Sequence, residues 1–247
     1  MQTLEKKASN RYRLKPHEIV ALEKMREAET RNVLVIGDLH EPFCLDEYLE
    51  FCIEQYEKWN CNQVIFIGDV IDNHYSSYHE INPDGMGGGK ELEYAIKRIA
   101  RWYNAFNDKG TKVIIGNHDR IIARKAQTGN IPKKWIRSYA EVLETPNWDF
   151  VDHYIQDNVL YQHGEGGTAR TACKSHMINV VQGHLHTQCY TENFVGKNFR
   201  TWAVQTGCGI NFSQYSFAYA KYGKKPAIAA AVVLENGTIP INLLMDL

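Results

Sequence analysis

The sequence lacks the features of a disulfide-rich, membrane-spanning or cysteine-zinc protein. Its six cysteines are scattered and form no Cys-x-x-Cys pair, which is typical of reduced thiols in an intracellular protein. No apolar run approaches the ~18 residues that a membrane span needs. The opening residues, MQTLEKKASN, do not lead into the apolar stretch of a signal peptide. We therefore expect a soluble, cytoplasmic protein without a membrane partner.

The chain also has no excess of either charge. Lysine and arginine number 28, and aspartate and glutamate number 29. Overall charge therefore favours no nucleic-acid or membrane partner, and only local clusters can indicate one. The 247 residues, of which 44% are hydrophobic, suffice for one large domain with an appendage. The oligomeric state is left open.

Residues 1–31 are polar and charged and differ from the rest of the chain. Within them, apolar side chains recur at roughly helical spacing, at Ile19, Val20, Leu22 and Met25. Pro16 suits the first turn of a helix. We predict an N-terminal helical extension, with a helix from Pro16 to Glu29 packed on the core, followed by one domain of residues 32–247.

That domain begins with three short runs, rich in β-branched residues, that each end in glycine. They are NVLVIG (32–37), NQVIFIG (62–68) and TKVIIG (111–116). Two runs with helical periodicity, 45–59 and 91–106, alternate with them. This alternation indicates parallel βαβ units. Residues 119–145 also look helical, with an interruption at 129–132.

The second half consists mostly of strand-like runs joined by close turns. The runs are WDFVDHYI, NVLYQH, INVVQG, QCYTENFV, KNFRTWAVQTG, AIAAAVVLENG and TIPINLL. One predicted helix, about 168–177, interrupts them. We therefore expect a second sheet, stacked on the first and built mostly from the C-terminal half.

Residue types that can bind metals directly follow each of the three early strands. In chain order they are Asp38, His40, Asp69, Asn117 and His118. Because the carboxyl ends of parallel strands line one crevice, we expect these side chains to converge. The glycine before each group lets the backbone turn sharply close to a ligand.

Two later strands end in the same way, on His163 and on Gly183-His184-Leu185-His186. Mixed nitrogen and oxygen donors suit Mn²⁺, Fe, Ni²⁺ or Zn²⁺ better than Mg²⁺ or Ca²⁺, and we prefer Mn²⁺. The number of candidate ligands exceeds the number that one tetrahedral site uses, so we predict two ions bridged by one carboxylate.

The blocks GDLH, GDVIDN, GNHD, a lone His-Gly and GHLH, in this order, resemble the signature of the calcineurin-like metallophosphoesterase superfamily. The resemblance implies an α/β fold, a four-layer α/β/β/α sandwich of two facing mixed β-sheets flanked by helices. It also implies that one metal is held by Asp38, His40 and His186. A second is then held by Asn117, His163 and His184, with Asp69 bridging.

The resemblance gives His118 a role that does not involve binding metal. It faces the leaving-group oxygen as general acid or transition-state stabiliser, and Asp72 or Asp119 orients its ring. The implied activity is that of a metal-dependent phosphoric ester hydrolase. A hydroxide that bridges both metals attacks phosphorus directly, without a covalent phospho-enzyme.

The blocks do not identify the substrate. Asn73 stands where the phosphoprotein-phosphatase branch has arginine, which disfavours a phosphoprotein. The chain most resembles small bacterial- or phage-type phosphoesterases, so we favour a phosphodiester of nucleotide or nucleic-acid type. The alternative is a monoesterase acting on a small molecule or nucleotide. A non-catalytic, metal-free scaffold of the same fold is disfavoured, because every ligand position is filled.

Several side chains near the blocks are candidate substrate contacts. His74 and Tyr75 follow the second block, and a tyrosine there can stack on a base, although His74 also suits a loop surface. Arg120 and Arg170 are candidate phosphate contacts, and a plain surface role fits each of them equally well.

The segment 120–137 carries six basic residues, no acidic residue and a tryptophan, Trp135. Basic side chains around an aromatic ring suit a nucleic-acid strand. The pattern also fits a solvated amphipathic helix with Trp135 and Ile136 in the core, and we favour this second interpretation.

Overall fold

The computed structural model describes residues 15–17, 19–20, 30–107, 110–219 and 223–246. The chain divides into two compact units, Met1–Thr30 and Arg31–Leu247. The helix predicted for 16–29 lies mostly outside the described residues, of which 16, 17, 19 and 20 are helical. All the elements that follow lie in the second unit.

The first sheet contains the predicted βαβ units. Its strand order is β11-β10-β1-β2-β3-β4. The four parallel strands are β1 (Val33–Ile36), β2 (Gln63–Phe66), β3 (Lys112–Ile114) and β4 (Asp149–Val151). The antiparallel hairpin of β10 (Ala229–Leu234) and β11 (Ile239–Leu244) extends the sheet beyond β1.

The second sheet has the order β5-β6-β7-β9-β8. Its strands are β5 (His153–Gln156), β6 (Val159–Gln162), β7 (Asn179–Gln182), β8 (Cys189–Val195) and β9 (Arg200–Thr206). The central three are parallel and the outer two antiparallel. The run WDFVDHYI, which we expected to form one strand, is divided between the sheets as β4 and β5. The expectation of one strand was therefore wrong, because the run is interrupted at the exposed Asp152.

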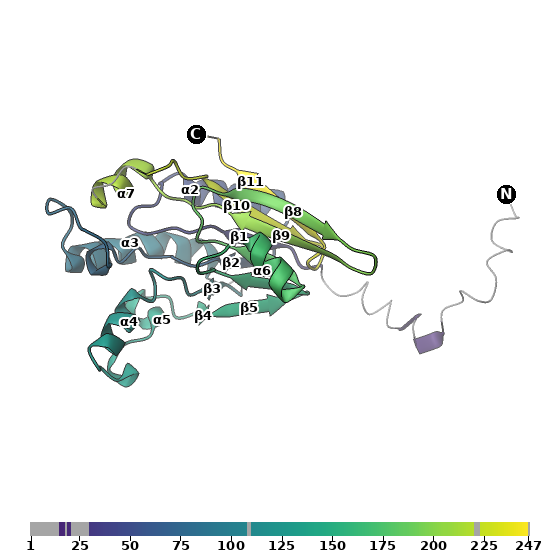
Figure 1. Ribbon diagram of the computed structural model, residues 1–247, viewed down its shortest axis with the longest axis horizontal. Helices are drawn as coiled ribbons and strands as arrows, with labels where there is room; N and C mark the ends of the chain where they lie inside the picture. Colours follow the sequence, from purple (N-terminus) through teal and green to yellow (C-terminus); the bar gives the residue numbers. More distant parts are fainter. Residues whose placement is uncertain (1–14, 18, 21–29, 108–109, 220–222, 247) are drawn as a thin grey trace, which may run out of the picture. The chain divides into compact units, whose positions relative to one another are not determined.

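Helices cover the outer face of each sheet. Those packed on the first sheet are α2 (Tyr48–Lys58) and α3 (Gly88–Phe106), and α6 (Ala169–His176) packs on the second. In the view of Figure 1, α6 lies in front of the sheets and α2 behind them.

The alternation of side chains along β1 shows how four layers arise. Leu34 and Ile36 are buried in the cluster beneath α2 and α3. Their neighbours Val33 and Val35 are buried in the cluster between the two sheets. Because successive residues of a strand point to opposite faces, a strand buried on both faces is apolar throughout. The predicted four-layer α/β/β/α sandwich is therefore confirmed.

The remaining helices are short and lie beyond the strand ends. The interruption predicted after Thr128 is present, between α4 (Ile121–Thr128) and the later turns η4 (Lys133–Trp135) and α5 (Tyr139–Val142). The sequence did not predict η3 (His74–Ser76) or α7 (Phe212–Ala218). In the described part of the chain, no helix has the length and apolar character to cross a membrane.

Candidate dinuclear metal centre

The strand ends of both sheets bring the predicted ligands into two groups. Each group has its ligand atoms within 4.8 Å of one another. The first group consists of Asp38, His40, Asp69 and His186, and the second of Asp69, His163 and His184. Asp69 belongs to both, so one carboxylate lies between two sets of imidazoles.

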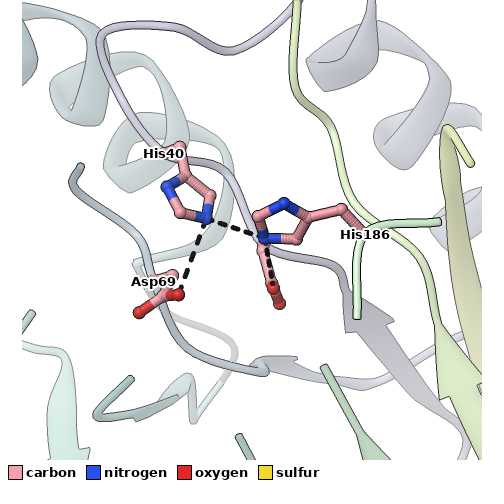
Figure 2. Close-up of side chains that lie close together, drawn as sticks. His40, Asp69 and His186 are labelled. Carbon is pink, nitrogen blue, oxygen red and sulfur yellow. Dashed lines mark hydrogen bonds and ion pairs between the residues drawn. The ribbon is translucent and has the colours of Figure 1, made fainter. Parts of the chain in front are cut away.

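In the first group, the ring nitrogens converge on the carboxylates. Nε2 of His40 lies 3.0 Å from Nε2 of His186 and 3.5 Å from Oδ2 of Asp69 (Figure 2). Nε2 of His186 lies 3.3 Å from Oδ2 of Asp38. Two imidazole nitrogens that face each other beside two carboxylates form a donor set suited to a transition metal.

The second group adds an amide oxygen. Nε2 of His163 lies 3.0 Å from Oδ2 of Asp69. Oδ1 of Asn117 lies 2.9 Å from Nε2 of His163 and 2.9 Å from Nδ1 of His184. All the side chains that we predicted as ligands therefore lie together at one edge of the facing sheets.

Outer hydrogen bonds orient two of the rings. Nδ1 of His40 lies 2.5 Å from Oδ1 of Asp72, and Nδ1 of His163 lies 3.1 Å from the carbonyl oxygen of Ile67. Each contact engages the outer ring nitrogen and leaves Nε2 for the centre. A carboxylate or carbonyl behind the ring is the usual support of a metal-binding histidine.

The glycines that end the strands let the backbone approach these carboxylates. A Cβ on Gly116 would lie 2.1 Å from Oδ1 of Asp69, and one on Gly183 would lie 2.3 Å from Oδ1 of Asp38. The loops are also strained, because His40 and Asp69 have φ angles of 51° and 48°. Left-handed backbone at non-glycine residues is uncommon and clusters at functional sites.

The charge and hydrogen bonding of the centre fit bound cations. Asp38 is buried, and among the described residues its Oδ1 accepts no hydrogen bond. A buried carboxylate oxygen without a donor is costly unless a cation compensates it. Burial lowers the pKa of His163, but Asp69 and Asp38 outweigh burial and raise this pKa to about 9. The site therefore favours positive charge at this position, and these residues can hold two metal ions that share Asp69.

His118 lies beside the first group. Its backbone N–H donates to Oδ1 of Asp69 at 2.8 Å, and its ring centroid is 4.6 Å from that of His40. Its Nδ1 lies 2.7 Å from the carbonyl oxygen of Asp72 and 3.4 Å from Oδ1 of the same residue. Burial lowers the pKa of His118, but Asp69 and Asp72 outweigh burial and raise it above its ordinary value.

The two carboxylates that we predicted to orient His118 have different surroundings. Asp72 is in contact with His118 and also with His40. Asp119 instead accepts the backbone N–H groups of Gly116 at 2.8 Å and Ile71 at 3.2 Å. Asp119 therefore ties together the loops after β2 and β3, and Asp72 is the carboxylate in contact with the His118 ring.

Of the two arginines predicted to contact substrate, Arg120 shares a pocket with one proposed ligand. It lines a pocket of about 570 Å³ together with His163, and pairs there with Asp152 at 3.0 Å and Glu165 at 2.7 Å. Arg170 instead forms an ion pair with Glu192 of β8. Arg170 therefore belongs neither to the two ligand groups nor to this pocket.

His74 and Tyr75 begin the loop beyond the second block. The backbone N–H groups of both donate to the carboxylate of Glu91, at 2.5 Å and 2.9 Å. The ring of His74 is buried, with its centroid 4.3 Å from that of Tyr219, whereas Tyr75 is 51% exposed. Only Tyr75 is therefore open to contact with a molecule in solution.

Sequence reasoning missed the contribution of α7 and the residue after it. Oη of Tyr219 donates to Oδ2 of Asp72 at 2.8 Å, which completes a chain of contacts from Tyr219 through Asp72 to His40. The ring of Tyr215 lies 5.4 Å from His40 and 6.1 Å from His186 between centroids. No motif marks these tyrosines, and only the density of aromatic residues at 212–219 could have suggested a role.

Solved structures with similarity to this chain include three with different descriptions. Vacuolar protein sorting 29 from Cryptosporidium parvum is 16% identical, with 88% of this chain and 92% of that chain covered and a TM-score of 0.46. The nuclease MPE of Pseudomonas putida is 16% identical over 85% and 86%, with a TM-score of 0.36. The E. coli phosphoesterase YfcE is 12% identical over 87% and 100%, with a TM-score of 0.42.

No curated protein matches the sequence significantly. Residues 31–207, however, match the sequence profile of the family described as calcineurin-like phosphoesterase. The match begins before β1 and ends after β9, so it includes the second sheet, the four parallel strands of the first sheet and every residue of the candidate metal centre. This chain therefore belongs to the calcineurin-like phosphoesterase family.

Proposed function

We propose that the protein is a metal-dependent phosphoesterase that hydrolyses a phosphodiester of nucleotide or nucleic-acid type. The observation that carries this proposal is the position of Asp69, whose Oδ2 lies 3.5 Å from Nε2 of His40 and 3.0 Å from Nε2 of His163. One carboxylate oxygen between two imidazoles from different loops is suited to bridging two cations.

The proposed ligand sets follow the two groups. Asp38, His40 and His186 would hold one ion, Asn117, His163 and His184 would hold the other, and both would share Asp69. When bound, the ions, Mn²⁺ in preference to Fe, Ni²⁺ or Zn²⁺, would supply activation of water and compensation of the charge on the phosphoryl oxygens. Two neighbouring groups position these ligands. Asp72 holds the ring of His40, and the carbonyl of Ile67 holds the ring of His163.

The proposed task of His118 is to donate a proton to the departing oxygen. Its Nδ1 is engaged by the carbonyl of Asp72, which leaves Nε2 for the substrate. The carboxylates of Asp69 and Asp72 raise its pKa and so favour the protonated form that a general acid needs.

A diester is favoured over a phosphoprotein by the surroundings of Asn73. Its Nδ2 donates to the carbonyl oxygen of His118 at 3.0 Å. This side chain therefore supports the His118 loop. Phosphoprotein phosphatases have an arginine at the position of Asn73. The alternative remains a monoesterase that acts on a small molecule or nucleotide.

The test uses the full chain, stripped of metal and reconstituted with Mn²⁺. We expect about two bound ions per chain by elemental analysis, and faster turnover of bis-p-nitrophenyl phosphate than of p-nitrophenyl phosphate. Asp69→Asn should lose both metal and turnover, whereas the exposed Asp149→Asn should retain both. Faster monoester turnover would favour the monoesterase. A protein that binds no metal and turns over neither compound would refute the proposal and indicate a scaffold.

A further inference from the structure

The segments that follow the second and third ligand-bearing blocks carry a basic surface with exposed aromatic rings. We define this basic–aromatic surface by Tyr75, Tyr78, Arg124, Lys125, Lys133, Lys134 and Trp135. Trp135 is 82% exposed, which corrects the interpretation that placed it in the core. Ile136 beside it is only partly buried. The turn η4 therefore presents a large, flat, apolar side chain to solvent, next to two lysines.

The charge of this surface is uncompensated within the described part of the chain. Residues 120–137 carry six basic and no acidic side chains. Arg120 pairs with two carboxylates, but no ion pair among the described residues engages Arg124, Lys125, Lys133 or Lys134. These four side chains are exposed and are available to an anionic partner.

One of the aromatic rings lies directly against two of the cations. Arg124 Cζ lies 5.3 Å and Lys125 Nζ 5.4 Å from the ring centroid of Tyr78. Tyr78 is nonetheless 60% exposed. Cation–π contacts at this distance hold the ring in place and keep positive charge beside an aromatic face.

The surface is continuous with the metal centre along the chain. Helix α4 begins at Ile121, two residues after Asp119, and η3 begins at His74, two residues after Asp72. Helices α3, α4 and α7 lie at the same end of the sheets, on the left in Figure 1. A polymer with one phosphate at the metal centre can therefore extend over this surface.

We infer that the basic–aromatic surface binds single-stranded nucleic acid, with bases stacked on Trp135 and Tyr78 and phosphates on the lysines and Arg124. This inference rests on the proposed function and names the substrate class of that site. Stacking requires unpaired bases, which a duplex does not offer, and an acidic peptide offers charge without flat rings. The combination of exposed rings with unpaired cations thus favours a single strand.

The experiment measures binding of a fluorescent 20-nucleotide dT strand to the full chain in EDTA, so that hydrolysis does not intervene. Trp135→Ala should raise Kd about tenfold, the effect of losing one stacked base, whereas Trp135→Phe, which can still stack, should raise it much less. The logarithm of the binding constant should fall linearly with the logarithm of the salt concentration. Replacing Lys133 and Lys134 by alanine should make this slope shallower by about 0.7 for each lysine. Matched controls are Phe199→Ala and Lys197→Ala, at exposed positions between β8 and β9.

The outcomes separate this inference from the proposed function. Turnover of bis-p-nitrophenyl phosphate by the unaltered protein tests the function alone. If turnover is present but the dT strand does not bind, or binds Trp135→Ala and the unaltered protein equally, the inference is wrong and the function stands. Equal binding of a duplex or of poly-glutamate, with no dependence on Trp135, would also overturn it by showing charge attraction alone.

Discussion

Asp72 is the residue on which two histidines with different proposed tasks depend. Its Oδ1 lies 2.5 Å from Nδ1 of His40 and its carbonyl oxygen 2.7 Å from Nδ1 of His118. Its Oδ2 accepts a hydrogen bond from Tyr219. Through its side chain and its backbone carbonyl, this one residue couples a proposed ligand to the proposed acid, so changes at His118 are easier to interpret than changes at Asp72.

Replacement of His118 by alanine should preserve the metal centre and impair catalysis. The residue contacts Asp69 through its backbone N–H, which alanine keeps. Loss of a general acid typically lowers the rate by about 10²- to 10⁴-fold. We expect this loss for esters with poor leaving groups, and a much smaller loss for p-nitrophenyl esters, whose leaving group needs no proton. Rates for both ester types and the metal content provide the measurement.

The exposed His17→Ala is the control, and it should change neither rate nor metal content. If His118→Ala lost metal in proportion to activity, His118 would be a ligand or a structural support. Unchanged rates with poor leaving groups would remove it from the mechanism.

At the scale of elements, the proposed centre depends on how closely the strand ends approach one another. A Cβ added to Gly116, at the end of β3, would lie 2.1 Å from Oδ1 and 2.4 Å from the backbone nitrogen of Asp69. The obstruction is partly backbone, so the loops must shift. Gly116→Ala should lower the free energy of unfolding by about 1–3 kcal/mol and weaken metal binding. Denaturant unfolding and metal titration measure the two effects.

Gly89→Ala provides the matched control. Gly89 lies in the first turn of α3, and a Cβ there would meet nothing within 4 Å. Alanine is the better helix former, so the change should be neutral or slightly stabilising. Equal stability and metal affinity for Gly116→Ala and the unaltered protein would show that the loops adapt without cost.

Elements with a strong local signal were predictable, and short ones were not. The strands β1, β2 and β3 are continuous apolar runs that end in glycine, so periodicity and composition identify them. Helix α7 has only seven residues, too few to be stable alone. It is held by the Asn211 cap and by packing of Tyr215 against His40, which are contacts that periodicity does not encode.

At the scale of the whole molecule, the proposed ligands join the two sheets. Asp38, Asp69 and Asn117 follow strands of the first sheet, and His163, His184 and His186 follow strands of the second. Metal that binds only the folded chain stabilises it by about 2.7 kcal/mol at 100 times Kd. For a chain of this size we expect Mn²⁺ to raise Tm by about 5–10 °C over EDTA.

Thermal unfolding with Mn²⁺ and with EDTA measures this shift. The same comparison on Asp69→Asn should show little or no shift, because the variant lacks the shared carboxylate. An unaltered protein with equal Tm under both conditions would mean that no metal joins the sheets.

The sequence by itself determined which strands form the parallel half of the first sheet and which side chains stand at their ends. Both are local properties, since a buried strand is apolar throughout and a strand-end loop begins directly after it. The convergence of Asp38, Asp69 and Asn117 follows from that parallel order. The sequence also indicated the basic charge of 120–137.

Only the tertiary structure decided which side chains are exposed to solvent and which segments far apart in the sequence are in contact. It placed Trp135 outside the core, paired Arg170 with Glu192 and brought Tyr219 to Asp72. The physical reason is that these outcomes depend on contacts between residues far apart in the chain. An amphipathic pattern specifies that a segment has an apolar face, but not whether a partner is available to cover it.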